Sequence, residues 1–194
     1  MPVEFAVAAY RMGHSMVRPS YEWNKIFSTG GQFGIATFEQ LFEFSGISGI
    51  RGEGDTPFRG LPTLPSNWIV DWRRLYDFGE EGGVTHSQLN FARQLDTQMT
   101  LALKNLPEFQ QLENPPPEPL LSLATRNLLR GRLLSLPTGQ AVAAAMSETP
   151  LTTAEITDSA PEEQKQFLRD GFANDTPLWY YVLAEAKIKG GGNH

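Results

Sequence analysis

Residues 8–24, AAYRMGHSMVRPSYEWN, place His14 in a largely apolar segment, three residues after Arg11. We expect residues 2–17 to form a buried helix, because apolar side chains lie on nearly every side of it. On such a helix Arg11 shares a face with His14. A buried guanidinium keeps its proton and therefore needs an anionic partner. The pair suits a ligand that carries a Lewis-acid centre and carboxylates. Alternatively, His14 is a hydrogen-bonded core histidine and Arg11 reaches the surface.

A second segment, LLSLATRNLLRGRLLSL at residues 120–136, is predicted to be a strongly periodic helix. Asn127 and Arg130 are three residues apart on it, so both can face inward. A lone asparagine inside a helix usually points at solvent. Alternatively, the Asn127 carbonyl accepts the Nδ1–H of a ligand histidine, which leaves Nε2 free for a metal.

The rest of the chain predicts a mainly α protein, since it shows no alternating strand pattern and no internal repeat. Trp68 and Trp72 have helical spacing, residues 114–119 predict an extended connector, and residues 47–65 predict an ordered surface loop. Two further helices are predicted, one ending at Gly46 and one following Pro137. In the C-terminal third, helix boundaries are predicted from the capping boxes Thr152-x-x-Glu155 and Ser159-x-x-Glu162, from Thr176 before Pro177, and from Gly190.

Composition excludes several classes of protein. The chain has 194 residues, a formal net charge of -6 and no basic tract, so we expect no binding to nucleic acid. It has no cysteine, which excludes disulfides, thiolate ligands and a cysteine nucleophile. No run reaches the roughly 18 apolar residues of a membrane span. The protein is expected to be soluble, in the cytoplasm, in the periplasm or outside the cell.

Several motifs in order along the chain resemble the animal-type haem peroxidase superfamily, in the form of its bacterial branch. AAYRMGHSMVRPSY is similar to the proximal-histidine helix of that superfamily, and RNLLRGRLLSLPTGQAVA is similar to its Asn-x-x-Arg-x-Arg segment. FEFSG, LPSNWIVDW and PLWYYVLAEA are similar to further landmarks of the branch. The resemblance implies an incomplete peroxidase fold in which residues 1–194 are the proximal-side portion of one domain. The distal-side N-terminal portion and the C-terminal end are expected to be absent from the chain.

The resemblance also implies roles for single residues. His14 corresponds to the axial ligand of the iron of haem b, and Asn127 holds its imidazole from the far side. Arg11 and Arg130 match arginines that approach the haem propionates. The family's distal histidine and arginine, its calcium loop and the carboxylates that can esterify haem lie upstream of the proximal helix, so no catalytic residue is assigned here. His86 is expected to be a surface or loop histidine and His194 has no role.

The implied reaction is reduction of hydrogen peroxide with oxidation of a small organic or halide donor. Within the superfamily the alternative is a fatty-acid dioxygenase, which uses a tyrosine at the position that Arg11 holds here; Tyr10 is one residue away. From another class, the chain is an inactive fragment that serves as an interaction or structural protein. A third hypothesis joins the two, with a second chain that supplies the distal half.

Overall fold

The computed structural model describes residues 1–45, 66–106 and 114–191. Over these ranges the chain is mainly helical, as predicted, and its only strand pairing joins β1 (Ser20–Tyr21) and β2 (Ala36–Thr37) antiparallel. The chain divides into two compact units. The helical unit consists of Met1–Val17 and Arg93–His194, and the loop-rich unit consists of Arg18–Ala92.

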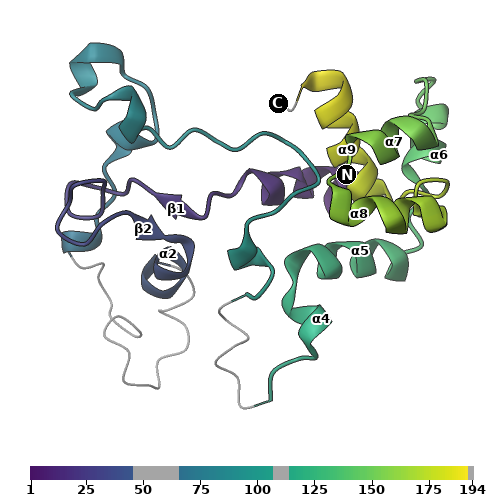
Figure 1. Cartoon of the computed structure of the whole chain (residues 1–194), viewed down its shortest axis with the longest axis horizontal. Helices are drawn as coiled ribbons and strands as arrows, with labels where there is room; N and C mark the ends of the chain where they lie inside the picture. The colour runs from purple at the N-terminus through teal and green to yellow at the C-terminus, as the bar shows by residue number, and fades with distance from the viewer. Residues whose placement is uncertain (46–65, 107–113, 192–194) are drawn as a thin grey trace. The chain divides into compact units, whose positions relative to one another are not determined.

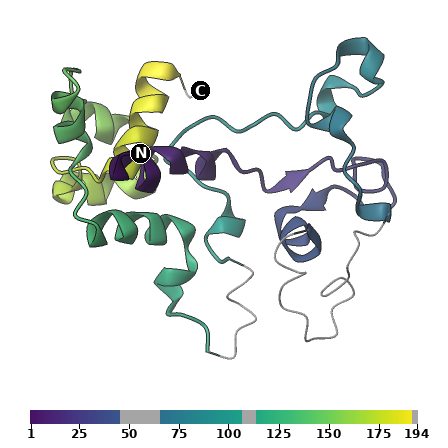
Figure 2. The ribbon, with the colours of Figure 1, turned by 180° about the vertical axis from the view of Figure 1, so that it is seen from behind.

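The helical unit is organised around its last helix, α9 (Leu178–Gly190), which contacts the N-terminal 3₁₀ helix and three α-helices. The yellow helix lies among the green helices and the purple N-terminal segment in both views (Figures 1 and 2). The other elements of this unit are α1 (Val3–Val7), the 3₁₀ helices η1 (Ala9–Met16) and η7 (Leu101–Leu103), α4 (Glu118–Leu121), α5 (Leu123–Leu133), α6 (Gly139–Ala145), α7 (Thr153–Ser159), α8 (Glu162–Phe167) and the π-helical turn η8 (Leu168–Phe172).

The core of the helical unit lies on two sides of α9. Tyr181 and Ala184 pack with Ile156 and Leu168 in one cluster, whereas Leu183 packs with residues of the other side in a second cluster. The second cluster includes Ala8, Leu95, Leu178 and Trp179. Because α9 supplies both clusters, it holds the N-terminal segment and the helices of the C-terminal half in one packed body.

The loop-rich unit contains the short sheet and α2 (Phe38–Ser45), and the helix end predicted at Gly46 lies outside the described residues. Its remaining described elements are the 3₁₀ turns η3 (Ser66–Trp68), η4 (Trp72–Arg74), η5 (Gly79–Gly82) and η6 (His86–Gln88). A small aromatic cluster of Phe27 and Trp68 is buried here. The predicted loop at residues 47–65 lies outside the described residues.

The prediction of one buried helix over residues 2–17 is wrong. The helix breaks at Ala8, whose φ of -118° lies outside the helical range, and the chain continues as the 3₁₀ helix η1. Several apolar side chains of the segment are exposed in this chain, among them Phe5 and Tyr10. Hydropathy therefore shows that the segment is apolar, but it does not show whether its side chains are buried within this chain.

Trp68 and Trp72 do not lie on one helical face. They belong to the separate 3₁₀ turns η3 and η4, and their exposed fractions are 2% and 59%. Helical spacing is a weak signal here, because two aromatic side chains can satisfy it by chance. The predicted extended connector is shorter than residues 114–119, since α4 begins at Glu118.

One of the two predicted capping boxes forms. Thr152 and Glu155 exchange the expected hydrogen bonds at the start of α7, with Thr152 N donating to Glu155 Oε2 at 2.7 Å. The second prediction is wrong, because Ser159 ends α7 and its hydroxyl donates to the Ile156 carbonyl. Pro161 precedes the first residue of α8 instead.

The boundaries predicted for α9 each differ by one residue. Its N-cap is Pro177 rather than Thr176, whose hydroxyl donates to the Ala173 carbonyl. Its C-cap is Gly191, with a φ of 61°, rather than Gly190. A glycine suits that left-handed conformation because it has no Cβ. None of the helices described by the structure is long and apolar enough to cross a membrane.

Candidate functional site

The 3₁₀ form of η1 places Arg11 and His14 one above the other. A 3₁₀ helix has three residues per turn, so side chains three apart eclipse. Ser15, which is fully buried, donates to the Met12 carbonyl at 3.0 Å and closes the last turn. The two polar side chains therefore leave η1 on one side, more closely aligned than on an α-helix.

The structure brings both of them to Asn127 on α5. Asn127 Nδ2 lies 2.9 Å from His14 Nδ1, and Arg11 Nη1 donates to Asn127 Oδ1 at 3.1 Å. These contacts join residues 113 and 116 positions apart in the sequence. Asn127 is 0% exposed, so it does not point at solvent. The cluster of Arg11, His14 and Asn127 is the candidate site.

The electrostatics of the site favour a neutral imidazole. Burial lowers the pKa of His14 from its ordinary value of 6.5, and the positive charge of Arg11 lowers the same pKa further. Neutral imidazole is the form that binds a metal, since an imidazolium has no free lone pair. Nothing in the described part of the chain hydrogen-bonds to His14 Nε2 in this arrangement.

Two elements hold the cluster in place. The Trp179 indole on α9 donates to the Arg11 carbonyl at 3.2 Å, and the Arg11 amide donates to the Ala8 carbonyl at 3.0 Å. On the other side, Ser122 caps α5 by accepting a hydrogen bond from the Thr125 amide. The backbone beneath Arg11 is thus fixed, whereas its side chain is held mainly by the bond to Asn127.

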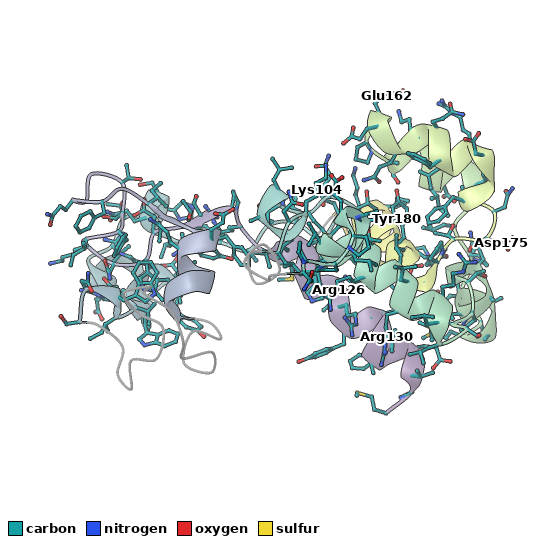
Figure 3. All side chains as sticks on the ribbon, turned by 90° about the horizontal axis from the view of Figure 1, so that it is seen from below. Lys104, Arg126, Arg130, Glu162, Asp175 and Tyr180 are labelled. Carbon is teal, nitrogen blue, oxygen red and sulfur yellow. The ribbon has the colours of Figure 1, made fainter. Side chains whose placement is uncertain are left out.

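The other residues singled out from the sequence are not in the cluster. Arg130 is exposed on α5 (Figure 3). It therefore does not share the buried face of Asn127, although its spacing from Asn127 allowed both to face inward. His86 is exposed in η6 of the loop-rich unit, where its ring lies 4.8 Å from the Phe91 ring. His194 lies outside the described residues. Side chains three residues apart on a helix differ in direction by about 60°, so this spacing allows a shared face but does not require one.

The amide of Asn127 is oriented differently from the sequence expectation. We expected its carbonyl to face His14, whereas the amide nitrogen does so and the carbonyl faces Arg11. Arginine is only a donor, so an asparagine between it and a histidine must turn its oxygen to the arginine. Sequence reasoning also missed the contact of Trp179 with the first turn of η1. The buried aromatic run at residues 179–181 was a usable signal, but it does not name the partner.

The cluster offers two groups to a cofactor, the His14 imidazole, which can bind a metal, and the Arg11 guanidinium, which can bind a carboxylate. No group of three or more His, Asp or Glu side chains that could hold a metal occurs among the described residues. A porphyrin needs only one protein ligand on this side, because its ring supplies four others. Arg11 Nε is buried without a hydrogen-bond partner in the described structure, and a carboxylate would satisfy it.

Two cavities of about 670 and 640 Å³ lie elsewhere in the helical unit. The first is lined by Trp179 and by Tyr180, which is labelled in Figure 3. The second is lined by Phe5 and Tyr181, and neither is lined by a residue of the cluster. In the cluster, Asn127 is buried, whereas Arg11 and His14 are partly exposed. Comparisons with models of protein families, with curated proteins and with solved structures find no match.

Proposed function

We propose that this chain is the proximal side of a haem peroxidase, with His14 as the axial ligand of the iron. The observation that carries the proposal is the pairing of His14 with a fully buried Asn127 more than a hundred residues away. The buried amide beside Nδ1 fixes the plane of the imidazole, so Nε2 is the ring nitrogen that can meet a ligand.

Each residue of the cluster has a distinct task in this proposal. When bound, haem would supply the redox chemistry for reducing hydrogen peroxide and oxidising a small organic or halide donor. His14 holds the cofactor through Nε2, and Asn127 orients the imidazole through Nδ1. Arg11, and Arg130 from the exposed side of α5, supply positive charge for the two propionates. A neutral amide behind the ligand keeps the imidazole closer to neutral than a carboxylate would.

The proposal is tested by haem binding. We expect the purified chain to bind haem in a stoichiometric complex with the absorption spectrum of histidine ligation. His14→Ala should abolish that spectrum, whereas the matched control His86→Ala should retain it, because His86 is exposed in the other unit. Equal haem retention in both variants would exclude His14 as the ligand.

The fatty-acid dioxygenase alternative has less support in the structure. It needs a tyrosine close to the axial histidine, and Tyr10 is 73% exposed with its ring 5.9 Å from that of Phe5. The interaction-protein alternative is favoured by one observation, the exposed apolar side chains of the N-terminal segment. They are Val3, Phe5, Tyr10 and Met12. Exposed apolar patches mark contact surfaces, and a second chain that supplies the distal half would also cover one.

A further inference from the structure

The tautomer of His14 follows from which groups of the cluster can donate a hydrogen bond and which can accept one. Arg11 can only donate, so the Asn127 oxygen faces Arg11 and the Asn127 amide nitrogen faces His14. That nitrogen also can only donate, so the neutral imidazole must accept at Nδ1. Neutral imidazole carries one proton, which then sits on Nε2. A protonated Nε2 cannot bind iron.

We infer that Arg11 is a positioning residue that keeps His14 in the non-ligating tautomer until a carboxylate of the cofactor captures the Arg11 guanidinium. This inference rests on the proposed function and concerns its regulation. A carboxylate that binds the guanidinium competes with the Asn127 oxygen for the hydrogen bonds of Arg11, and this frees that oxygen. The amide can then turn over, and its oxygen accepts the Nδ1–H of His14. The imidazole loses the proton at Nε2 to water and takes one at Nδ1, so its charge does not change.

The structure supplies both requirements of such a change. Arg11 Nε is buried without a partner, so the guanidinium gains a hydrogen bond when a carboxylate reaches it. The backbone of Arg11 is held by Trp179 and Ala8, so only side chains need to move. Carboxylate binding and metal ligation are therefore coupled through Asn127, and each strengthens the other.

The tautomer can be measured without iron. In protein with ¹⁵N-labelled histidines, long-range ¹H–¹⁵N spectra distinguish a protonated Nε2 from a protonated Nδ1, and His14→Gln assigns the signals. At a pH where His14 is neutral we expect Nε2–H in the ligand-free protein. Protoporphyrin IX, which has the two propionates but no metal, should convert it to Nδ1–H. Its dimethyl ester should not.

Three substitutions make the test specific. Asn127→Asp places an acceptor toward both neighbours, so His14 should take the Nδ1–H form with Arg11 still in place. Arg11→Met should release the Nε2–H form, whereas Arg11→Lys, which is also only a donor, should keep it. Arg132→Met removes an exposed cation from the same helix, α5, and should change nothing.

Affinity gives the second measurement. The ligand-free protein should bind haem at least about tenfold more tightly than haem dimethyl ester, which corresponds to roughly 1.4 kcal/mol, and Asn127→Asp should reduce that ratio. Nδ1–H in the ligand-free protein, or an unchanged tautomer in Asn127→Asp, would overturn the inference. If the tautomer responds as expected but no form binds haem, the positioning role stands and the proposed function fails.

Discussion

The two units of this chain are stabilised by different means. The helical unit packs apolar side chains around α9, and its helices α5, α6 and α7 begin at side-chain caps. The loop-rich unit has a small aromatic core and a buried polar network centred on Glu22 and Arg74. Helical periodicity in the sequence therefore describes only the helical unit. The loop-rich unit is held together by side chains that hydrogen-bond to backbone groups far away in the sequence.

The largest effect is expected from breaking the polar network of the loop-rich unit. Arg74 Nη1 donates to Glu22 Oε2 at 3.0 Å, both residues are buried, and Glu22 also accepts from the Thr29 amide. Removing one partner leaves a buried charge, which costs about 3–5 kcal/mol. Glu22→Ala should therefore abolish amide protection in the described residues of the loop-rich unit, 18–45 and 66–92, and leave the helical unit protected. Hydrogen exchange measures both units in one sample.

The control is Glu39→Ala, which removes an exposed carboxylate from the first turn of α2. It should cost no more than about 1 kcal/mol, through the helix dipole. If Glu22→Ala unfolded both units together, the division of the chain into two independently stabilised parts would be wrong.

A smaller effect is expected from overpacking the helical unit at Gly139. A Cβ there would overlap the Tyr181 ring, which is 2% exposed and whose hydroxyl accepts the Leu151 amide. The ring is thus pinned at both ends, and Gly139→Ala should cost about 1–3 kcal/mol. The measurement is denaturant unfolding followed by tryptophan fluorescence.

Gly131→Ala is the matched control, because its Cβ would meet only Leu136 Cδ1 at an ordinary 3.7 Å. Gly131 lies inside α5, where alanine is favoured over glycine by about 1 kcal/mol. The two substitutions should therefore have opposite signs. Equal effects would mean that the packing of α6 on α9 is loose.

The sequence predicted much of the helical unit for a physical reason. Periodicity and caps are local, so α5, α6 and the box at Thr152 were found directly. The 3₁₀ form of η1 was missed, because it depends on Trp179 and Asn127, which arrive only on folding. The network of the loop-rich unit was missed for the same reason. Asn90 bonds to Glu22 across 68 residues, and no local pattern reports such a partner.

The residues of the candidate site could be predicted from the sequence, but their arrangement could not. His14, Asn127 and Arg11 were singled out, and the structure brings the three together. The orientation of the amide depends on which neighbour can accept, and only the assembled cluster fixes that. Arg130 illustrates the opposite case, because a spacing of three residues did not make it face inward.

The stability of the helical unit should depend on pH through His14. The pKa of His14 is lowered by burial and then by Arg11, so the unfolded chain binds more protons than the folded chain below about pH 6.5. The free energy of unfolding should therefore fall as the pH drops from about 6.5 toward the folded pKa of His14. Above about pH 6.5 the imidazole is neutral in both states, so His14 should not change the free energy of unfolding there. His14→Gln should flatten that fall, and His86→Gln should not. The check is denaturant unfolding at several pH values; the same slope in all three proteins would contradict it.

The smallest effect is expected at the two predicted capping boxes, of which the structure contains one. The Thr152 hydroxyl accepts from the Glu155 amide at 3.2 Å, so Thr152→Ala leaves donors of α7 unpaired at a cost of about 1 kcal/mol. The Ser159 hydroxyl instead donates to the Ile156 carbonyl inside the end of α7, so Ser159→Ala should cost only a few tenths of that. Thr152→Ala and Ser159→Ala each remove one hydroxyl, at the start and at the end of α7, and their thermal unfolding can be compared directly. Because Glu155 also bonds to the Thr152 amide, Glu155→Gln should keep most of the stability, which separates the hydrogen bond from the charge. If Ser159→Ala proved as costly as Thr152→Ala, Ser159 would cap α8 after all, and the local pattern would be the better guide to this part of the helical unit.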